Sequence, residues 1–263
     1  MAGKVYAEQD TRDPRIAWLV FDHQERRNAI SVEMWRELPR IAAELDEDRN
    51  VRVVVLRGVG DVAFVSGADI SEFEEKRTGA AAGRYEHDNS QAFQALSRMS
   101  KPVLAMIHGF CVGGGVALSL TADVRYAADD AVFAIPAARL GLGYNMGGLQ
   151  ALSQVVGFSA AKEIFFTARR FDAAEALRMR LVNAVLPKAE LEAFVRDQAE
   201  RIAANAPLTL RSVKQIVGEL AKPAAERDVA AVETGIHVCM QSEDYREGMR
   251  AFLEKRRPEF KGR

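Results

Sequence analysis

Short apolar runs alternate with stretches of helical periodicity over the first 186 residues of the chain. A continuous apolar run predicts a buried strand, whereas apolar residues three or four positions apart predict one face of a helix. On this basis we expect strands at residues 16–21, 51–56, 103–107, 124–127, 132–134 and 182–186, and helices at residues 31–45, 84–99, 149–167 and 172–180. Strands and helices that alternate along a chain are typical of an α/β fold.

The remainder of the chain is expected to be helical. Helical periodicity continues over residues 188–257, with breaks expected near Pro207 and Pro223. We therefore expect an α/β core over residues 1–200 and an α-helical oligomerisation region over residues 201–263. The helices of this region carry apolar stripes, and we expect another subunit to bury them.

Two segments depart from the regular pattern. Pro39 lies inside the predicted helix at residues 31–45, where proline lacks an amide hydrogen, so we expect a kink. Residues 78–83 are rich in alanine and glycine and are weakly patterned, so we expect a mobile loop there. Ser31 is the expected N-cap of the helix that contains Pro39.

Composition and charge exclude several classes of protein. The 263 residues include 36 basic and 37 acidic side chains, and the net charge of −1 argues against a nucleic-acid partner. No apolar run reaches the roughly 18 residues that span a bilayer, and residues 1–13 lack the apolar core of a signal peptide. Cys111 and Cys239 are too few for a disulfide framework, so we expect a cytoplasmic protein. The four histidines lack metal-ligand spacing, so no metal is expected.

The most distinctive stretch contains three consecutive glycines, Gly113, Gly114 and Gly115, between an apolar run and a helical segment. Without side chains in the way, the backbone amides of such a turn can approach a ligand closely, and a helix that begins there adds unpaired N–H groups. The stretch therefore suits an anion or a developing oxyanion. The alternative is a glycine turn that only packs a helix against a strand.

A second turn of small residues, at residues 66–70, also lies between an apolar run and a helical segment. If the two turns lie side by side, one backbone N–H group from each can bind the same oxygen atom. The pair would then form an oxyanion hole without any side chain. Each donor in such a site contributes on the order of 10²–10³ in rate.

Several motifs together resemble the crotonase superfamily, also called the enoyl-CoA hydratase/isomerase family. They extend through nearly the whole chain, at residues 27–30 (Arg-Asn-Ala-Ile), 66–70 (Ser-Gly-Ala-Asp-Ile), 101–103, 108–115, 122–123 and 251–260. The resemblance implies a spiral of ββα units with a helical C-terminal trimerisation region, assembled as a homotrimer or homohexamer. It also implies an acyl-CoA thioester substrate, in which coenzyme A is part of the substrate and no separate cofactor is needed.

The resemblance implies roles for particular residues. The thioester oxygen would accept hydrogen bonds from the amides of Ala68 and Gly114. Phe252 and Lys255 of a neighbouring subunit would cover the adenine and phosphate end of CoA. The complete set of implied substrate-binding residues is Arg26, Arg27, Ala29, Ser66, Asp69, Ile70, Gly113, Pro136, Ala137, Phe252 and Lys255.

The sequence departs from the family pattern at its proton-transfer positions. Hydratases of the family carry a glutamate two residues after the last glycine of the triplet, where this chain has Ala117. They carry a second glutamate directly after a later proline, where this chain has Ala137 after Pro136. Hydration needs groups that take and return a proton, and alanine can do neither. The usual pair of carboxylates is therefore missing.

Residues 136–145 are similar to a different branch of the family, methylmalonyl-CoA decarboxylase, which has a tyrosine at the position of Tyr144. Loss of CO₂ creates an enolate without a base, and glutamates would repel a substrate carboxylate. The likeness is partial, because that branch has histidine at the position of Ala68 and keeps a glutamate at that of Ala117. Tyr144 is the expected polar catalytic group, and a tyrosine that only bridges apolar packing is the alternative.

Three functions remain open at this point. The favoured one is an acyl-CoA lyase that forms an enolate, with decarboxylation assisted by Tyr144. The second is hydration or isomerisation of an enoyl-CoA with relocated acid and base groups, for which Glu72, Glu74 and Glu75 are candidates. The third is a non-catalytic relative that binds acyl-CoA or RNA.

Overall fold

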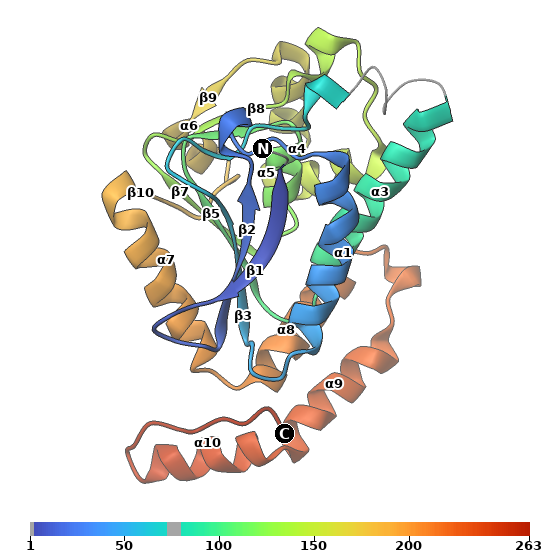
Figure 1. Cartoon of the computed structure of the whole chain (residues 1–263). Helices are drawn as coiled ribbons and strands as arrows, with labels where there is room; N and C mark the ends of the chain where they lie inside the picture. Colours follow the sequence, from blue (N-terminus) through green and yellow to red (C-terminus); the bar gives the residue numbers. More distant parts are fainter. Residues whose placement is uncertain (1–2, 73–79) are drawn as a thin grey trace.

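The computed structural model describes residues 3–72 and 80–263, and places the strands in two sheets (Figure 1). The larger sheet has the order β1-β2-β3-β5-β7-β10, in which β1 is antiparallel to β2 and the other neighbours are parallel. Its strands are β1 (Lys4–Gln9), β2 (Ile16–Asp22), β3 (Val53–Gly58), β5 (Val103–Ile107), β7 (Val124–Ala128) and β10 (Ala184–Leu186). The smaller sheet has the order β4-β6-β8-β9, with β4 (Ala63–Val65), β6 (Phe110–Val112), β8 (Val132–Ala134) and β9 (Phe171–Asp172).

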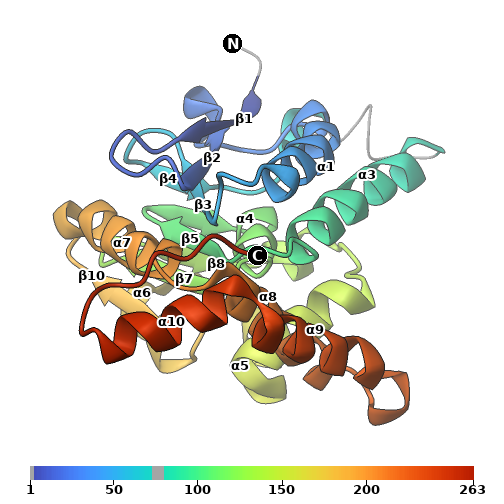
Figure 2. The ribbon, with the colours of Figure 1, turned by 90° about the horizontal axis from the view of Figure 1, so that it is seen from below.

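Helices pack on both faces of the larger sheet and form an extension at the C-terminal end. The α-helices are α1 (Val32–Glu47), α3 (Ala80–Ser97), α4 (Gly114–Ser119), α5 (Met146–Thr167), α6 (Ala173–Arg178), α7 (Lys188–Ala203), α8 (Pro207–Leu220), α9 (Val229–Gln241) and α10 (Glu243–Leu253). Short 3₁₀ helices are η1 (Gln24–Arg26), η2 (Ile70–Glu72), η3 (Pro136–Leu140) and η4 (Ala224–Glu226). Figures 1 and 2 show α9 and α10 outside the α/β body. The structure thus has the expected α/β core followed by helices.

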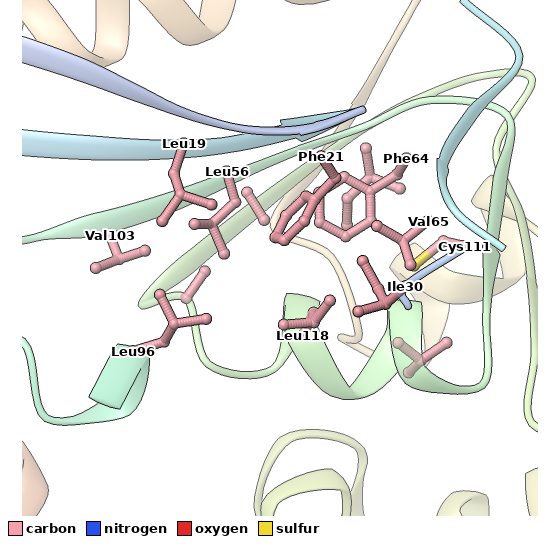
Figure 3. Close-up of a cluster of buried hydrophobic side chains, with 14 of the residues drawn as sticks. Leu19, Phe21, Ile30, Leu56, Phe64, Val65, Leu96, Val103, Cys111 and Leu118 are labelled. Atoms are coloured by element: carbon pink, nitrogen blue, oxygen red, sulfur yellow. The ribbon is translucent and has the colours of Figure 1, made fainter. Parts of the chain in front are cut away.

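The alternation of side chains along β2 explains why both faces of the larger sheet are covered. Successive residues of a strand point to opposite faces, so a strand that is buried on both faces is apolar throughout. Leu19 and Phe21 belong to the core beneath α1 and α3, whereas Trp18 and Val20 belong to the core beneath α7. Figure 3 shows part of the first core, where Phe21 packs edge-to-face on Phe64 with ring centroids 5.9 Å apart. This contact joins the larger sheet to the smaller one.

Several details differ from the sequence expectations. The strand β1 was not predicted, because only Val5 of its residues is buried and the segment is otherwise polar. The helix α3 begins at Ala80 instead of residue 84, so the predicted mobile loop at residues 78–83 is helical from Ala80 onward, and residues 78 and 79 lie outside the described residues. Pro39 lies inside α1, which continues through it as one helix.

Two further features of the helices were not predicted. The helix α5 is interrupted by non-helical backbone at Gly157, which has a φ of +79°. The chain also breaks between α9 and α10 at Ser242, whose hydroxyl caps α10 by accepting from the amide of Tyr245 at 3.0 Å. Both cysteines are free, Cys111 buried and Cys239 partly exposed.

Candidate active site

Three parallel strands of the smaller sheet lead directly into three of the predicted site segments. The strand β4 is followed by Ser66 and Ala68, β6 by Gly113, and β8 by Pro136 and Ala137. Because β4, β6 and β8 are parallel, their carboxyl ends meet at one edge of the sheet. The open edge at the carboxyl ends of parallel strands is where α/β proteins bind their ligands.

The two small-residue turns lie against each other, as the sequence analysis required for a shared site. The amide nitrogen of Ala68 lies 3.6 Å from the position that a Cβ atom on Gly114 would occupy. The carbonyl oxygen of Val112 lies 3.3 Å from the corresponding position on Gly67. Ala68 and Gly114 are both partly exposed, so a ligand can reach them. The structure therefore brings two backbone amides from different turns to one partly open spot.

Hydrogen bonds fix the turn at Ala68 while leaving its own amide available. The amide of Ile30 donates to the carbonyl of Gly67 at 2.8 Å, and the amide of Asp69 donates to the carbonyl of Ile30 at 2.9 Å. These bonds hold the residues on both sides of Ala68 against the segment before α1. Among the hydrogen bonds of the described residues, none uses the amide of Ala68 or of Gly114. The two N–H groups are thus partly exposed donors that other hydrogen bonds of the described residues do not use.

Two glycines of the triplet are required, Gly113 by the backbone and Gly115 by close packing. Gly113 has a φ of +54°, a left-handed conformation that glycine adopts without strain, and it precedes the first residue of α4. A Cβ atom on Gly115 would lie 2.0 Å from the carbonyl oxygen of Val65, so only glycine fits there. A Cβ atom on Gly114 would make only contacts of ordinary length, the nearest at 3.6 Å. Gly113 and Gly115 thus shape the turn, and Gly114 faces the open spot.

The loop that holds Arg26, Arg27 and Ala29 is tied to the same edge. The carbonyl of Arg26 accepts from the Ser66 hydroxyl at 3.0 Å, and the carbonyl of Arg27 accepts from the Ser66 amide at 3.1 Å. Arg27 has a φ of +52°, which turns the chain back toward α1. Ala29 is buried, and its carbonyl contacts His23 Nδ1 at 3.0 Å. Four of the predicted substrate-binding residues are therefore adjacent in space.

Asp69 also stabilises the loop that holds Arg26, through an ion pair with that arginine. Its carboxylate is 93% buried and pairs with Arg26 at 3.1 Å, while Ser71 donates to it from both its amide and its hydroxyl, at 3.0 and 2.7 Å. Burial raises the pKa of the Asp69 carboxyl, but the Ser71 hydrogen bonds and the Arg26 charge outweigh burial and lower the pKa below its usual value. Asp69 is thus held as an anion that positions the loop. Ile70 follows it as the first residue of η2.

Two aromatic residues of the site were not recognised from the sequence. The Trp35 ring lies 3.6 Å from the Cβ position of Gly114, and its Nε1 donates to the Tyr85 hydroxyl at 3.3 Å. Phe93 packs edge-to-face on the same ring, with centroids 5.2 Å apart. From the sequence, Trp35 was only one residue of the predicted helix at residues 31–45. Tyr85 lies fifty positions further along the chain, and no local pattern links the two.

Tyr144 and Ala137 belong to the segment after β8. Ala137 is buried in η3, and Tyr144 is half-buried directly before Asn145, which caps α5. The Tyr144 ring packs edge-to-face on Phe165 of α5, with centroids 4.7 Å apart. Ala117 lies in α4 and is partly exposed. The Tyr144 ring is therefore held by an aromatic contact, which is what the packing alternative predicts. This contact involves the ring and gives the hydroxyl no catalytic role.

Phe252 and Lys255 lie apart from the other predicted site residues. Phe252 is in α10 and is 82% exposed, and Lys255 follows the end of that helix. Figures 1 and 2 place α10 away from α4 within the one chain. Within one chain these two residues lie away from the site, and the family resemblance assigns them to the site of a neighbouring subunit.

The candidate carboxylates after Ile70 divide into two groups. Glu72 accepts a hydrogen bond from the Val32 amide at 2.9 Å, so it satisfies the first turn of α1. Glu74 and Glu75 lie outside the described residues.

Over residues 3–72 and 80–263, no group of three or more histidine, cysteine, aspartate or glutamate side chains is arranged to hold a metal ion. Within the same residues, no helix is long and apolar enough to cross a membrane.

The fold and this geometry define an α/β protein with two small-residue turns in contact at the carboxyl edge of parallel strands. The sequence profile of the enoyl-CoA hydratase/isomerase family matches residues 11–263, and the chain belongs to this family. It is 33% identical over 253 residues to the short-chain-enoyl-CoA hydratase of Clostridium acetobutylicum, covering 96% of this chain and 97% of the relative. It is 32% identical over 260 residues to the peroxisomal Delta(3,5)-Delta(2,4)-dienoyl-CoA isomerase of Arabidopsis thaliana, covering 94% and 93%.

The solved structures agree with the sequence comparisons. The crystal structure of an enoyl-CoA hydratase/carnithine racemase from Magnetospirillum magneticum matches with a TM-score of 0.91 and 35% identity, over 95% of this chain and 93% of that one. The enoyl-CoA hydratase of Bacillus anthracis matches with a TM-score of 0.89 and 31% identity, over 98% and 99%. The expected crotonase fold is therefore confirmed, and the chain is an enzyme of this family by its membership.

Proposed function

We propose that this protein acts on an acyl-CoA thioester whose carbonyl oxygen accepts hydrogen bonds from the amides of Ala68 and Gly114. The observation that carries the proposal is the contact of the two turns, in which the Ala68 amide nitrogen lies 3.6 Å from the position that a Cβ atom on Gly114 would occupy. Negative charge develops on the thioester oxygen when an enolate forms, and two fixed donors stabilise that charge more than they stabilise the neutral substrate. No side chain of the protein is needed for this step.

For the reaction itself, hydration or isomerisation of an enoyl-CoA is the first candidate. The names of the relatives support it, since they are hydratases and an isomerase. Because Ala117 and Ala137 cannot carry protons, the acid and base groups must come from elsewhere in the site. The Tyr85 hydroxyl, held by Trp35 beside Gly114, and Glu74 and Glu75 are the groups to test.

Decarboxylation is the second candidate, and Ala137 favours it. A buried alanine at the position of a family glutamate leaves apolar surroundings that do not repel a carboxylate on the substrate. Loss of CO₂ leaves its electron pair on the α-carbon, which the thioester carbonyl delocalises as an enolate. The enolate then takes a proton, for which the half-buried Tyr144 hydroxyl is the candidate donor.

Two turnover assays separate these candidates. Loss of the crotonyl-CoA double-bond absorbance indicates hydration, and release of CO₂ from methylmalonyl-CoA indicates decarboxylation. Under the first candidate, Tyr144→Phe leaves crotonyl-CoA hydration within about twofold of the unchanged protein, because only one hydroxyl is removed. Under the second candidate, Tyr144→Phe lowers CO₂ release on the order of 10²-fold, the scale of a general-acid contribution. Tyr6→Phe, on the distant strand β1, is the matched control and changes neither rate.

A third outcome would contradict catalysis altogether. If the protein turns over neither thioester nor other enoyl-CoA chain lengths but binds CoA tightly, it is a non-catalytic acyl-CoA-binding relative. Binding to RNA that weakens steeply with salt would indicate the nucleic-acid alternative, which the net charge of −1 disfavours. Either result would overturn the proposed catalytic function, the first in favour of acyl-CoA binding and the second in favour of RNA binding.

We also propose that the helices after residue 200 join copies of the chain into a homotrimer or homohexamer. Apolar side chains are exposed on α8, α9 and α10, with Val217 at 59%, Ile236 at 42% and Leu253 at 80% exposure. Large apolar side chains exposed in such number are typical of an interface. In such an assembly, Phe252 and Lys255 of one copy would complete the CoA site of its neighbour.

A further inference from the structure

The outer face of the smaller sheet carries two arginines on one aromatic ring. The guanidinium carbon of Arg27 lies 4.7 Å from the centroid of the Phe110 ring, and that of Arg170 lies 5.8 Å from the same centroid. Arg27 comes from the loop after β2, while Arg170 directly precedes β9 at the edge of the sheet. The side chains thus converge on β6 from separate parts of the chain.

Neither of these arginines is neutralised by a carboxylate within the described residues. The acidic groups nearby have other partners. Asp69 pairs with Arg26, Glu175 pairs with Arg169, and Asp172 accepts from the Glu175 amide at 2.8 Å. Arg27 and Arg170 are both exposed, and Phe110 is half-exposed. A cation over an exposed aromatic face is only weakly stabilised, and like charges beside one ring repel each other. An anion would relieve this repulsion.

The pair lies next to the turn that supplies the Ala68 amide. The Arg27 carbonyl accepts from the amide of Ser66, two residues before Ala68, so the Arg27 backbone is part of the site edge. Arg170 approaches the same ring from the β9 side. A ligand that places its carbonyl oxygen at Ala68 and extends across the face of β6 would therefore pass these two guanidinium groups.

We infer that Arg170, together with Arg27 on the Phe110 ring, binds phosphate groups at the nucleotide end of the acyl-CoA substrate. Guanidinium is the cation best suited to this, because its planar donors pair with two phosphate oxygens at once. The nucleotide end of CoA carries a 3′-phosphate and a diphosphate, so two separated arginines can each find a partner. Arg27 was already expected near the nucleotide, whereas Arg170 and Phe110 were not. This inference rests on the proposed use of an acyl-CoA thioester.

The test compares one acyl group carried on CoA and on pantetheine, which lacks the nucleotide phosphates. In Arg170→Ala, the kcat/KM ratio of the CoA thioester to the pantetheine thioester falls about tenfold, as expected for loss of one charge-assisted hydrogen-bonding partner. Arg27→Ala gives a similar fall. Arg98→Ala, an exposed arginine at the end of α3, leaves the ratio unchanged and is the matched control. An unchanged ratio in Arg170→Ala overturns the inference.

A binding experiment separates this inference from the proposed reaction. Calorimetry with CoA and with 3′-dephospho-CoA needs no turnover, so it reports on the arginines even if the reaction has been misassigned. CoA affinity that falls about tenfold in Arg170→Ala supports the inference. If 3′-dephospho-CoA shows the same fall, Arg170 contacts the diphosphate, and if it shows none, Arg170 contacts the 3′-phosphate. Failure of the unchanged protein to bind either compound would overturn both the inference and the proposed function.

Discussion

Gly114 and Gly115 are neighbours with opposite tolerances for a side chain. Gly115 packs against the main chain, because a Cβ atom would lie 2.0 Å from the Val65 carbonyl oxygen. Gly114 faces the spot shared with the Ala68 amide, where a Cβ atom meets nothing closer than 3.6 Å. The same small substitution therefore tests the fold at one position and the chemistry at the next.

Gly114→Ala is predicted to fold normally and to lose activity. The added methyl group makes only ordinary van der Waals contacts, but it occupies the spot where the two amides converge. We expect the free energy of unfolding to change by less than about 1 kcal/mol. We expect kcat/KM to fall on the order of 10²-fold, because the methyl group keeps the thioester oxygen away from donors that remain in place. Denaturant titration and steady-state kinetics measure the two effects.

Gly115→Ala is the comparison for this prediction. Here the methyl group cannot fit without moving β4, and overpacking of this kind costs about 1–3 kcal/mol or more. Full activity in Gly114→Ala, with unchanged stability, would show that the amide of Gly114 does not bind the reacting oxygen.

At the scale of elements, the connection between the two sheets carries a buried histidine. His108 lies between β5 and β6, is 95% buried, and its carbonyl accepts from the Phe64 amide at 2.8 Å. Its Nε2 atom has no hydrogen-bond partner among the described residues. Burial lowers the pKa of His108, and the nearby Asp130 offsets this only in part. The folded protein therefore holds this imidazole neutral.

This histidine predicts a specific dependence of stability on pH. In the unfolded chain His108 takes up a proton below its ordinary pKa of about 6.5, whereas in the folded chain the lowered pKa delays uptake. The unfolded state thus binds more protons, and the free energy of unfolding falls as the pH drops from 7 to 5. His108→Gln removes this part of the fall, which denaturant titrations at the two pH values detect.

His237→Gln is the control, because it makes the same exchange at a histidine that is exposed on α9 instead of buried. If the curves of His108→Gln and the unchanged protein are parallel between pH 7 and pH 5, the histidine is not the group responsible.

The elements also show what could be predicted from the sequence. The buried strands β2, β3 and β5 were predictable because both of their faces are covered, so the apolar run is continuous. The edge strand β1 was not, because its polar residues form a strand only through pairing with β2. The contact of the two small-residue turns followed from two strand–turn–helix patterns once their strands were taken as neighbours.

Other site residues could not be found in this way. Trp35 meets Tyr85, and Arg27 and Arg170 meet the Phe110 ring, only after segments far apart in the sequence pack together. Each of these residues looks ordinary in its local pattern, as an apolar helix position or a surface charge. Their contacts form only through long-range packing, and no pattern of neighbouring residues in a single sequence predicts these contacts.

At the scale of the whole molecule, the C-terminal helices expose more apolar surface than an isolated chain would be expected to show. Val213, Val217 and Leu220 are each more than half exposed on α8, and Phe252 and Leu253 are at least 80% exposed on α10. The helix α8 is nevertheless fixed to the core, because Lys214 donates to the Lys101 carbonyl and to Asp123, both at 2.8 Å. The exposed face is therefore presented at a fixed position.

Val217→Glu is predicted to break the assembly. A charge at the centre of an apolar interface is costly because it must be desolvated without a partner. We expect the mass in solution, measured by analytical ultracentrifugation, to fall from a trimer or hexamer toward the 29.0 kDa of one chain. CoA affinity should fall with it, since Phe252 and Lys255 would no longer reach a neighbouring site.

Val62→Glu is the matched control, because this valine is 55% exposed on a different part of the molecule. The control variant keeps the mass of the unchanged protein. A monomeric unchanged protein with full activity would contradict the proposed role of the assembly.

The two proposed oxygen-binding donors, the amides of Ala68 and Gly114, are main-chain atoms, and this affects how such an enzyme can evolve. Mutation exchanges side chains, so almost every substitution around the pair leaves both N–H groups in place. Proton carriers can then be lost and replaced at other positions, as Ala117 and Ala137 suggest, without a generation in which the anion is no longer stabilised. The reaction type can therefore change by single substitutions around such a site. Gly113 and Gly115 are the exceptions, because a side chain at either position would distort the turn that holds the donors.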